Sequence, residues 1–415
     1  MKKIILSTIA AGMLYAGGDI VPVEPEVKVV SPTNTLADAF KNGKVSGQIR
    51  AGYINFDPEL SGDTTTFSTA IGGQLKYETA AYYGFSLGAA FYTSHAVMGL
   101  SGERSEGKYN NELSSDTHYD VLAESYINYH HGDFNIRIGR QLIDTPYADS
   151  DDIRMTPNTF EGVVASYGLG NITLLGAYLT KWQGPDAESY DFVDLLGPDA
   201  DGVAMAAVTY ADDMFEGGIW YYGADETADV FYGDISMTYV LSDGVELKGG
   251  LQYASQSEKS NSGIDGTLFG AMAEVGFSGV TLGIAYDTLD VDDGKEYFGG
   301  FGGGVGFVNM DEMTAGIFMI SQGGDAWKFS FAYDFAEVGI EGLGFEYDYG
   351  DFKGDKIHEA IEQNIILSYA HGDEWDIEAV YSMIEDENRD FGEDSNGNPA
   401  DGGFNRLLVR ANYNF

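Results

Sequence analysis

From Val45 to the end of the chain, apolar and polar residues alternate with a period of two in one segment after another. In WKFSFAYDF, for example, every second residue from Trp327 to Phe335 is aromatic, and the residues between them are Lys328, Ser330, Ala332 and Asp334. Side chains of a β-strand point alternately to its two faces. The pattern therefore predicts many strands, each with one apolar and one polar face.

The composition agrees with this interpretation and excludes some functions. The chain has 56 glycines, 28 tyrosines, 24 phenylalanines and nine prolines, which favours strands and turns over helices. With 66 acidic and 22 basic residues, the net charge is −44, so nucleic acid is not expected as a partner. Cysteine is absent, which excludes disulfides and thiolate sites.

The first 18 residues have the layout of a secretory signal peptide. Lys2 and Lys3 precede an apolar run from Ile4 to Leu14, and small residues follow at Ala16 to Gly18. The run is shorter than the roughly 20 residues of a membrane-spanning helix; a buried N-terminal helix is the alternative. Residues 19–44 are then expected to form a periplasmic segment, with a proline-rich extended tether followed by a short helix in TLADAFKNGK.

Two all-β architectures would satisfy the alternation, namely a soluble sandwich and a membrane barrel whose apolar faces meet lipid. The signal peptide, the aromatic residues at the ends of the apolar faces, and the alternation of short turns with long loops favour the barrel. Turns such as HHGD, LSDG, FSG and AHGD are short. The long polar stretches lie near residues 94–118, 142–160, 181–201, 256–266, 289–325 and 384–404. We therefore expect a transmembrane antiparallel β-barrel over residues 45–415.

Nineteen alternating segments can be counted, whereas single-chain bacterial barrels normally have an even number of strands. The segment TAGIFMIS, from Thr314, alternates least and is assigned to a loop, which leaves 18 strands. The last strand, RLLVRANYNF, is expected to close the barrel against the first, VSGQIRAGY, so that no edge remains unpaired in the membrane. Phe415 resembles the terminal aromatic signal that the barrel-assembly machinery recognises.

Basic residues of the polar faces are candidates for lining the pore, because charged side chains along a pore select ions. Arg50, Lys76, Arg406 and Arg410 would cluster at the closing seam, and Arg137 would lie on the fifth strand. Inward-facing acids are expected on other strands: Asp120, Glu124, Glu246, Glu274, Glu346, Asp376 and Glu378. Such an arrangement would orient dipolar solutes; the alternative is that the acids and bases pair with one another.

Two loops are candidates for folding into the lumen. In DTPYADSDDIRMTPNTFEG, Pro146 and Pro157 keep the segment out of the sheet, and Asp152 and Arg154 carry opposite charges. Folded inward, Arg154 would stand at the constriction. The glycines of YFGGFGGGVGFVNM would permit close packing inside the lumen. The alternative for both loops is a position on the outer surface.

Catalysis, cofactors and metals find little support in the sequence. The six histidines lack metal-ligand spacing, and DSNGNPADGG has Pro399 where a calcium loop requires glycine. The chain has no phosphate-loop lysine motif, and no nucleophile–base pair is identifiable. We therefore expect neither an enzyme nor a bound cofactor or metal.

Three segments resemble the OprD-like (Opr family) outer-membrane porins: LADAFKNGKVSGQIRAGYI, IRIGRQLIDTPYADSDDIRMTPNTFEG and DAWKFSFAYDFAEVGIEGLGFEYDYGD. The resemblance implies an 18-stranded pore whose third and seventh loops fold inward. It also implies a ladder of basic residues that guides carboxylate-bearing solutes. This sequence departs from such a ladder in its many inward-facing acids. The general porins, with 16 strands, fit less well.

The expected function is thus passive diffusion of small hydrophilic solutes, preferably carboxylate-bearing, across the outer membrane of a Gram-negative bacterium. The alternatives are a general or cation-preferring porin, and a structural or adhesive barrel with a plugged lumen. The expected partners are these solutes, outer-membrane lipid and lipopolysaccharide, and the assembly machinery through Phe415. A homotrimer is one further option.

Overall fold

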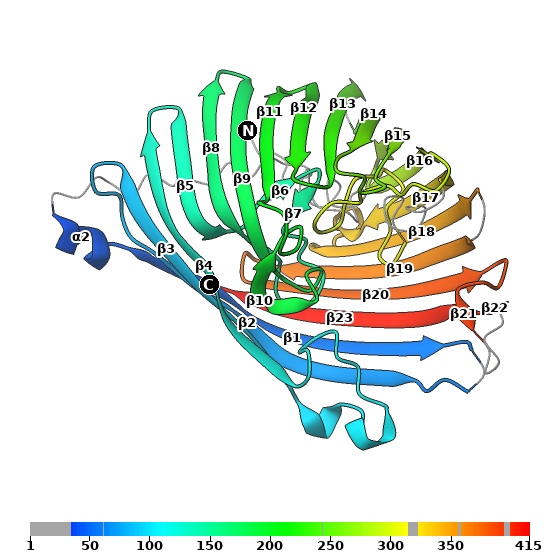
Figure 1. Ribbon diagram of the computed structural model, residues 1–415. Helices are drawn as coiled ribbons and strands as arrows, with labels where there is room; N and C mark the ends of the chain where they lie inside the picture. The colour runs from blue at the N-terminus through cyan, green and yellow to red at the C-terminus, as the bar shows by residue number, and fades with distance from the viewer. Residues whose placement is uncertain (1–34, 61, 243, 314–322, 356–357, 394–398) are drawn as a thin grey trace.

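The computed structural model describes residues 35–60, 62–242, 244–313, 323–355, 358–393 and 399–415, and it shows a closed antiparallel β-barrel (Figure 1). Nineteen strands of the described chain belong to one sheet, and one of them, β10 (Ser189–Asp194), pairs only with the end of β9. The other 18 form the barrel. They are β1 (Lys44–Pro58), β2 (Thr66–Glu78), β3 (Phe85–Ala96), β4 (His118–His131), β5 (Phe134–Gln141), β8 (Thr159–Leu169), β9 (Ile172–Gly184), β11 (Val203–Ala211), β12 (Phe215–Ala224), β13 (Ala228–Ser242), β14 (Val245–Glu258), β15 (Gly266–Phe277), β16 (Val280–Val291), β17 (Gly324–Asp334), β18 (Leu343–Gly354), β19 (Glu359–His371), β20 (Trp375–Asp386) and β23 (Phe404–Asn414).

The remaining elements are short. Helix α2 (Leu36–Lys41) begins after Thr35, whose side chain accepts a hydrogen bond from the backbone N–H of Asp38 at 3.1 Å, so the predicted short helix is confirmed. The others are the hairpins β6 (Asp144–Thr145) with β7 (Ala148–Asp149) and β21 (Gly392–Glu393) with β22 (Pro399–Ala400), and the 3-10 turns η1 (Met98–Leu100), η2 (Arg104–Glu106) and η3 (Phe335–Val338). Among the described residues, no helix is long and apolar enough to cross a membrane.

The barrel closes between its first and last strands, as the sequence predicts. β1 and β23 pair antiparallel from Gln48 opposite Asn414 to Pro58 opposite Phe404. Beyond the last strand residue, Phe415 and Gly47 exchange two backbone hydrogen bonds of 2.9 and 3.0 Å. The strand count of 18 is confirmed. The TAGIFMIS segment and the expected signal peptide lie outside the described residues.

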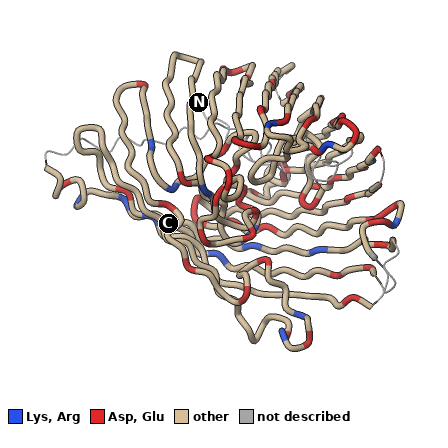
Figure 2. The backbone as a smooth tube through the Cα atoms, viewed as in Figure 1, with Lys and Arg blue, Asp and Glu red and all other residues tan. Residues whose placement is uncertain are grey.

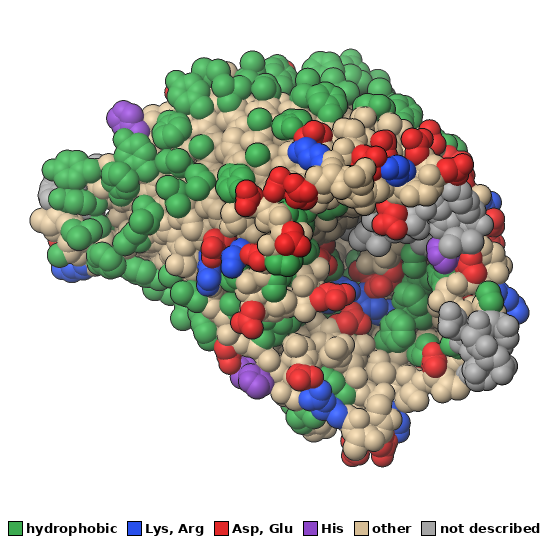
Figure 3. Space-filling view, viewed as in Figure 1, with side chains coloured by type: hydrophobic (Ala, Val, Ile, Leu, Met, Phe, Trp, Pro, Cys, Tyr) green, Lys and Arg blue, Asp and Glu red, His purple; other side chains and the backbone are tan. Residues whose placement is uncertain are grey.

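The alternation seen in the sequence separates the outer wall from the lumen. On the outer wall, Ile49, Phe329 and Trp327 have 54%, 48% and 43% of their surface exposed, which suits contact with lipid. Their neighbours Arg50 and Lys328 are buried inside. Hydrophobic side chains accordingly cover much of the outer wall in Figure 3, and charged side chains gather in the hollow.

One inward assignment is wrong because β4 contains a β-bulge. Opposite Ala90 and Phe91, the partners are Glu124 and Leu122, so Ala123 is an additional residue in the strand. A bulge of one residue reverses the faces of the residues beyond it. Glu124 therefore points inward and is buried, whereas Asp120 points outward beside His95.

Both loops proposed to fold inward do so. They are the segment between β5 and β8 (residues 142–158, called loop A here) and the described part of the segment after β16 (residues 292–313, loop B). The two loops lie together inside the barrel in Figure 1. Tyr147 and Asp149 of loop A exchange backbone hydrogen bonds with Phe301 of loop B, at 3.0 and 2.8 Å. Gly302 makes this approach possible: its φ is +103°, and a Cβ there would lie 2.4 Å from the carbonyl oxygen of Asp149.

Aromatic packing fixes the loops against the wall. Tyr147 contacts Tyr222 of β12 and Tyr232 of β13, with ring centroids 5.4 and 6.1 Å apart. Phe307, Val308 and Met310 of loop B join the same buried apolar cluster. The loops therefore occupy the part of the lumen beside β9 and β11–β18. Charged side chains of the closing strands β1 and β23 face them from the opposite side.

Candidate functional site in the lumen

The seam strands β1 and β23 contribute arginines that bind loop A. Arg50, only 2% exposed, donates to Asn412 on β23 at 2.7 Å and to both carboxylate oxygens of Asp152 at 2.6 and 2.7 Å. It also donates to the backbone oxygen of Arg154 at 2.9 Å. Arg410 donates to the backbone oxygen of Asp152 and, at 2.7 Å, to the carboxylate of Glu378. Loop A is thus held by side chains of the closing strands.

Asp152 is paired with Arg50 and also faces the lumen. Its side chain is 41% exposed, whereas that of Arg50 is almost fully buried. The wall and loops around Asp152 desolvate its carboxyl in part, which acts to raise the pKa of that group. The Arg50 guanidinium outweighs this effect and holds the pKa of Asp152 below its ordinary value. Asp152 is therefore a carboxylate at neutral pH.

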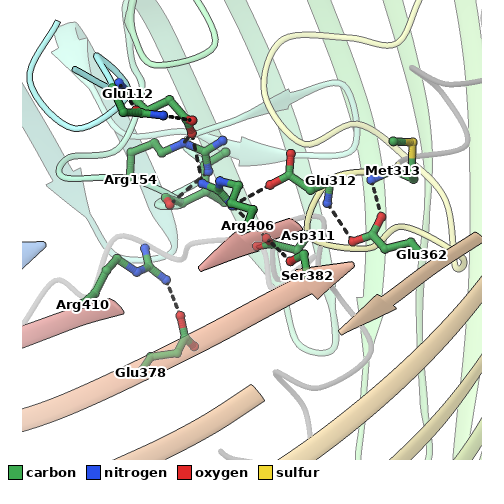
Figure 4. Close-up of polar contacts among 12 residues, drawn as sticks. Glu112, Arg154, Asp311, Glu312, Met313, Glu362, Glu378, Ser382, Arg406 and Arg410 are labelled. Atoms are coloured by element: carbon green, nitrogen blue, oxygen red, sulfur yellow. Dashed lines mark hydrogen bonds and ion pairs between the residues drawn. The ribbon is translucent and has the colours of Figure 1, made fainter. Parts of the chain in front are cut away.

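Arg406 joins two further loops at the centre of the site (Figure 4). Its side chain is 1% exposed and contacts Glu112, of the loop between β3 and β4, at 3.1 Å. It also contacts Asp311 and Glu312 of loop B at 2.8 and 2.5 Å. Arg154 from loop A contacts the same Glu112 oxygen at 3.0 Å. Three loops therefore meet at one buried arginine of the closing strand.

Loop B has further attachments to the wall below this centre. Asp311 accepts a hydrogen bond from Ser382 of β20 at 2.8 Å, and Glu362 of β19 accepts from the backbone N–H groups of Glu312 and Met313 at 3.0 and 2.7 Å (Figure 4). Burial raises the pKa of Glu312 to about 7 in spite of the Arg406 guanidinium. Burial also acts on Asp311, but Arg406 holds its pKa below the ordinary value.

Loop A carries a group of acids of its own, formed by Asp144, Asp149, Asp151 and, from the neighbouring loop, Asp186. Burial raises the pKa of Asp149 to about 7, and the nearby Asp144 adds to the shift. Burial and then Asp186 raise the pKa of Asp151. Figure 2 shows how Asp and Glu line the loops inside the barrel. In the described parts of the chain, no group of three or more His, Cys, Asp or Glu residues is arranged to hold a metal ion.

The structure thus brings five of the predicted residues together, namely Arg50, Asp152, Arg154, Arg406 and Arg410. Lys76 lies apart on β2, where its ammonium group contacts Glu124 at 2.7 Å. Asp152 pairs with Arg50 and not with Arg154. The acids of the loops, Glu112, Asp311 and Glu312, were not identified from the sequence, because they lie outside alternating strands and no local motif marks them.

Arg137 on β5 differs from the other inward-facing bases. Its guanidinium lies over the ring of Tyr126, 4.2 Å from the centroid, and donates to Asn128 at 3.4 Å. Within the described residues it has no carboxylate partner at ion-pair distance. It lines a recess between the wall and the start of loop A. The recess also contains Asn135, Gln141, Thr145, Val164, Leu175 and Met205.

The chain is similar to known porins. The family model described as outer membrane porin, OprD family, matches residues 39–391. No curated protein matches the chain. Pseudomonas aeruginosa OccK8 (OprE) shares 17% identity, with a TM-score of 0.72 over 91% of this chain and 99% of that one.

Two other crystal structures give the same picture. P. aeruginosa OpdK shares 18% identity, with a TM-score of 0.74 over 91% of this chain and 99% of that one; OpdK has also been solved with vanillate. Acinetobacter baumannii OccAB3 shares 15% identity, with a TM-score of 0.73 over 90% of this chain and all of that one. With the inward loops and charged seam described above, the family match confirms the resemblance seen in the sequence. The chain belongs to the OprD family of outer membrane porins and resides in the outer membrane of a Gram-negative bacterium.

Proposed function

We propose that this porin lets small hydrophilic solutes diffuse passively across the outer membrane and prefers those that bear a carboxylate. The observation that carries the preference is the state of Arg137. The other predicted pore-lining bases, Arg50, Lys76, Arg154, Arg406 and Arg410, each contact a carboxylate of the protein. The guanidinium of Arg137 has no such partner in the described chain, and its charge is available to a solute.

The surroundings of Arg137 suit a small carboxylate with an apolar body. Asn135, Gln141 and Thr145 add polar groups, while Val164, Leu175 and Met205 form an apolar wall. A guanidinium binds a carboxylate through two parallel hydrogen bonds and stays charged at every working pH. That OpdK was solved with vanillate, an aromatic carboxylate, supports the same class of solute.

The geometry also favours a second candidate, a cation-preferring porin. Glu112, Asp311 and Glu312 contact Arg154 or Arg406, and Glu362 accepts a hydrogen bond from the backbone of Glu312 beside them. Acidic residues therefore outnumber arginines at the point where three loops meet. Charges of one sign along a pore attract counter-ions. In that case the charge of Arg137 would have little influence on the ion preference of the pore.

Liposome uptake distinguishes the two candidates. Arg137→Gln should reduce the uptake of benzoate several-fold and leave that of benzyl alcohol nearly unchanged. Arg140→Gln is a matched control, because Arg140 lies on the same strand, points outward and pairs with Glu161 at 3.0 Å. Equal uptake of benzoate through the two variants would reject the carboxylate preference and leave the cation-preferring porin.

A further inference from the structure

The ring of Tyr126 on β4 lies against the inner side of the barrel wall and carries Arg137. Tyr126 is 4% exposed and is the direct cross-strand neighbour of Gly88 on β3. A Cβ at Gly88 would overlap the ring, so the absence of a side chain there lets the ring rest on the backbone of β3. With one face against the wall, the ring has the guanidinium of Arg137 over the other, 4.2 Å from its centroid.

A hydrogen bond at the far end of the ring fixes its direction. The Tyr126 hydroxyl donates to Glu78 of β2 at 2.7 Å, and Ser86 of β3 donates to the same carboxylate at 3.3 Å. A hydroxyl that donates to a carboxylate is polarised, which makes the ring more electron-rich and strengthens its attraction for a cation over its face. The ring is therefore held in one orientation and favours a guanidinium above it.

Asn128 holds the guanidinium of Arg137 at a second point. Asn128 is the cross-strand neighbour of Arg137, is 3% exposed and accepts a hydrogen bond from its Nε at 3.4 Å. The amide of Asn128 in turn donates to Asn135 at 3.0 Å, which fixes its orientation. The terminal nitrogens Nη1 and Nη2 of Arg137 have no partner among the residues that the structure describes, and Arg137 lines the recess. These two nitrogens are therefore the ones that a solute can reach.

We propose that Tyr126 is a positioning residue that, together with Gly88 and Asn128, directs the Nη1 and Nη2 edge of Arg137 into the recess. The inference rests on the proposed function and adds how the carboxylate is bound, namely end-on by both terminal nitrogens. An arginine side chain has many rotamers, and holding it in one of them before the solute arrives reduces the entropy lost on binding. A fork held in this way matches the two oxygens of a carboxylate.

Liposome uptake of benzoate and of benzyl alcohol tests the proposal. Tyr126→Leu should reduce the uptake of benzoate by roughly three- to tenfold, as expected for the loss of a cation–π contact, and leave that of benzyl alcohol nearly unchanged. Tyr126→Phe retains the ring and should keep most of the benzoate uptake. Gly88→Ala retains both Tyr126 and Arg137 but displaces the ring from the wall, so it should also reduce the uptake of benzoate.

Tyr129→Leu is the matched control. Tyr129 lies on the same strand but on the outer wall, where its ring packs against that of Phe85 with centroids 4.7 Å apart. Its replacement removes a tyrosine ring from β4 without touching Arg137, and the uptake of both solutes should stay at the wild-type level.

A double-mutant cycle shows whether Tyr126 acts through Arg137. In the Arg137→Gln background, Tyr126→Leu should cause no further loss of benzoate uptake. An additional loss of the same size as in the wild type would mean that the ring shapes the lumen independently of Arg137, and would overturn the proposal. An equal fall in the uptake of benzoate and benzyl alcohol in Tyr126→Leu would overturn it as well.

Failure of this inference differs from failure of the proposed function. If Arg137→Gln reduces the uptake of benzoate and Tyr126→Leu does not, the positioning role is wrong and the carboxylate preference stands. If Arg137→Gln has no effect on benzoate, the carboxylate preference is wrong, and the positioning role is rejected with it.

Discussion

The guanidinium of Arg50 binds the carboxylate of Asp152 through two hydrogen bonds of 2.6 and 2.7 Å, and so connects the first strand of the barrel to loop A. The arginine is buried in the wall and the aspartate faces the lumen, with side chains 3% and 41% exposed. A paired fork of this kind restricts orientation as well as distance. The position of loop A in the lumen therefore depends on the strand that closes the barrel.

Arg50→Met should release this attachment. Hydrogen bonds to charged groups contribute about 1.5–3 kcal/mol each, so the inward position of loop A would be weakened by at least tenfold in population. We expect a larger and more variable single-channel conductance, while the barrel itself still forms. Lys108→Met is the control, since Lys108 pairs with Glu106 in an exposed loop. A steady wild-type conductance in Arg50→Met would show that other contacts suffice to hold loop A.

The alternation of the strands made much of this structure predictable. The inward position of Arg50 and the closure of β23 on β1 follow from it, because a period of two assigns each side chain to one face. Asp120 was misassigned because a single bulged residue, Ala123, reverses the faces without any clear sign in the sequence. The clustering of Glu112 and Asp311 on Arg406 could not be predicted either. Contacts between distant loops depend on tertiary packing, and no sequence spacing records them.

Glu312 should make the channel depend on pH. Burial raises its pKa to about 7 when loop B is docked, above the value of about 4.3 for a free glutamate. The docked state therefore binds the proton more tightly. The stability that this proton adds to the docked state is complete below about pH 4.3 and declines as pH rises from about 4.3 to 7. Above that window the lumen also carries one more negative charge.

We accordingly expect the permeability ratio of K⁺ to Cl⁻ to increase between about pH 5.5 and 8.5, measured as a reversal potential in a salt gradient. Glu312→Gln should remove most of this increase. Asp149, whose pKa burial also raises to about 7, would account for a smaller remainder. Glu103→Gln, in an exposed loop, is the control and should keep the wild-type response. An unchanged response in Glu312→Gln would assign the titration to other groups.

Deleting Phe415 should impair assembly of the barrel. The deletion removes both backbone hydrogen bonds to Gly47 and the aromatic residue expected to engage the assembly machinery. A deletion of equal size within residues 387–403, between β20 and β23, leaves the closing pair intact and serves as the control. The fraction of heat-modifiable protein in outer membranes measures the result. Equal fractions for the two deletions would contradict a role of Phe415 in closure.

Arg154→Ala should alter selectivity more than stability. Arg154 is 16% exposed and contacts Glu112, which keeps Arg406 as a second partner at 3.1 Å. Glu112 therefore remains paired after the substitution, and the lumen loses one positive charge. Salt screens charges beyond roughly 8–10 Å, so the more distant acids of the wall contribute little to the electrostatic potential at this position. We expect a wider pore and a larger fall in the uptake of small carboxylates than of neutral sugars.

Two further variants separate charge from size. Arg154→Lys keeps the positive charge without the bidentate geometry, so it should restore part of the carboxylate uptake. Lys108→Ala removes a base from an exposed outer loop and should leave both uptake rates unchanged. If Arg154→Ala retains the conductance and anion preference of the wild type, loop A does not line the constriction. A general porin would then describe the channel better, because its lumenal bases would serve mainly to hold the loops in place.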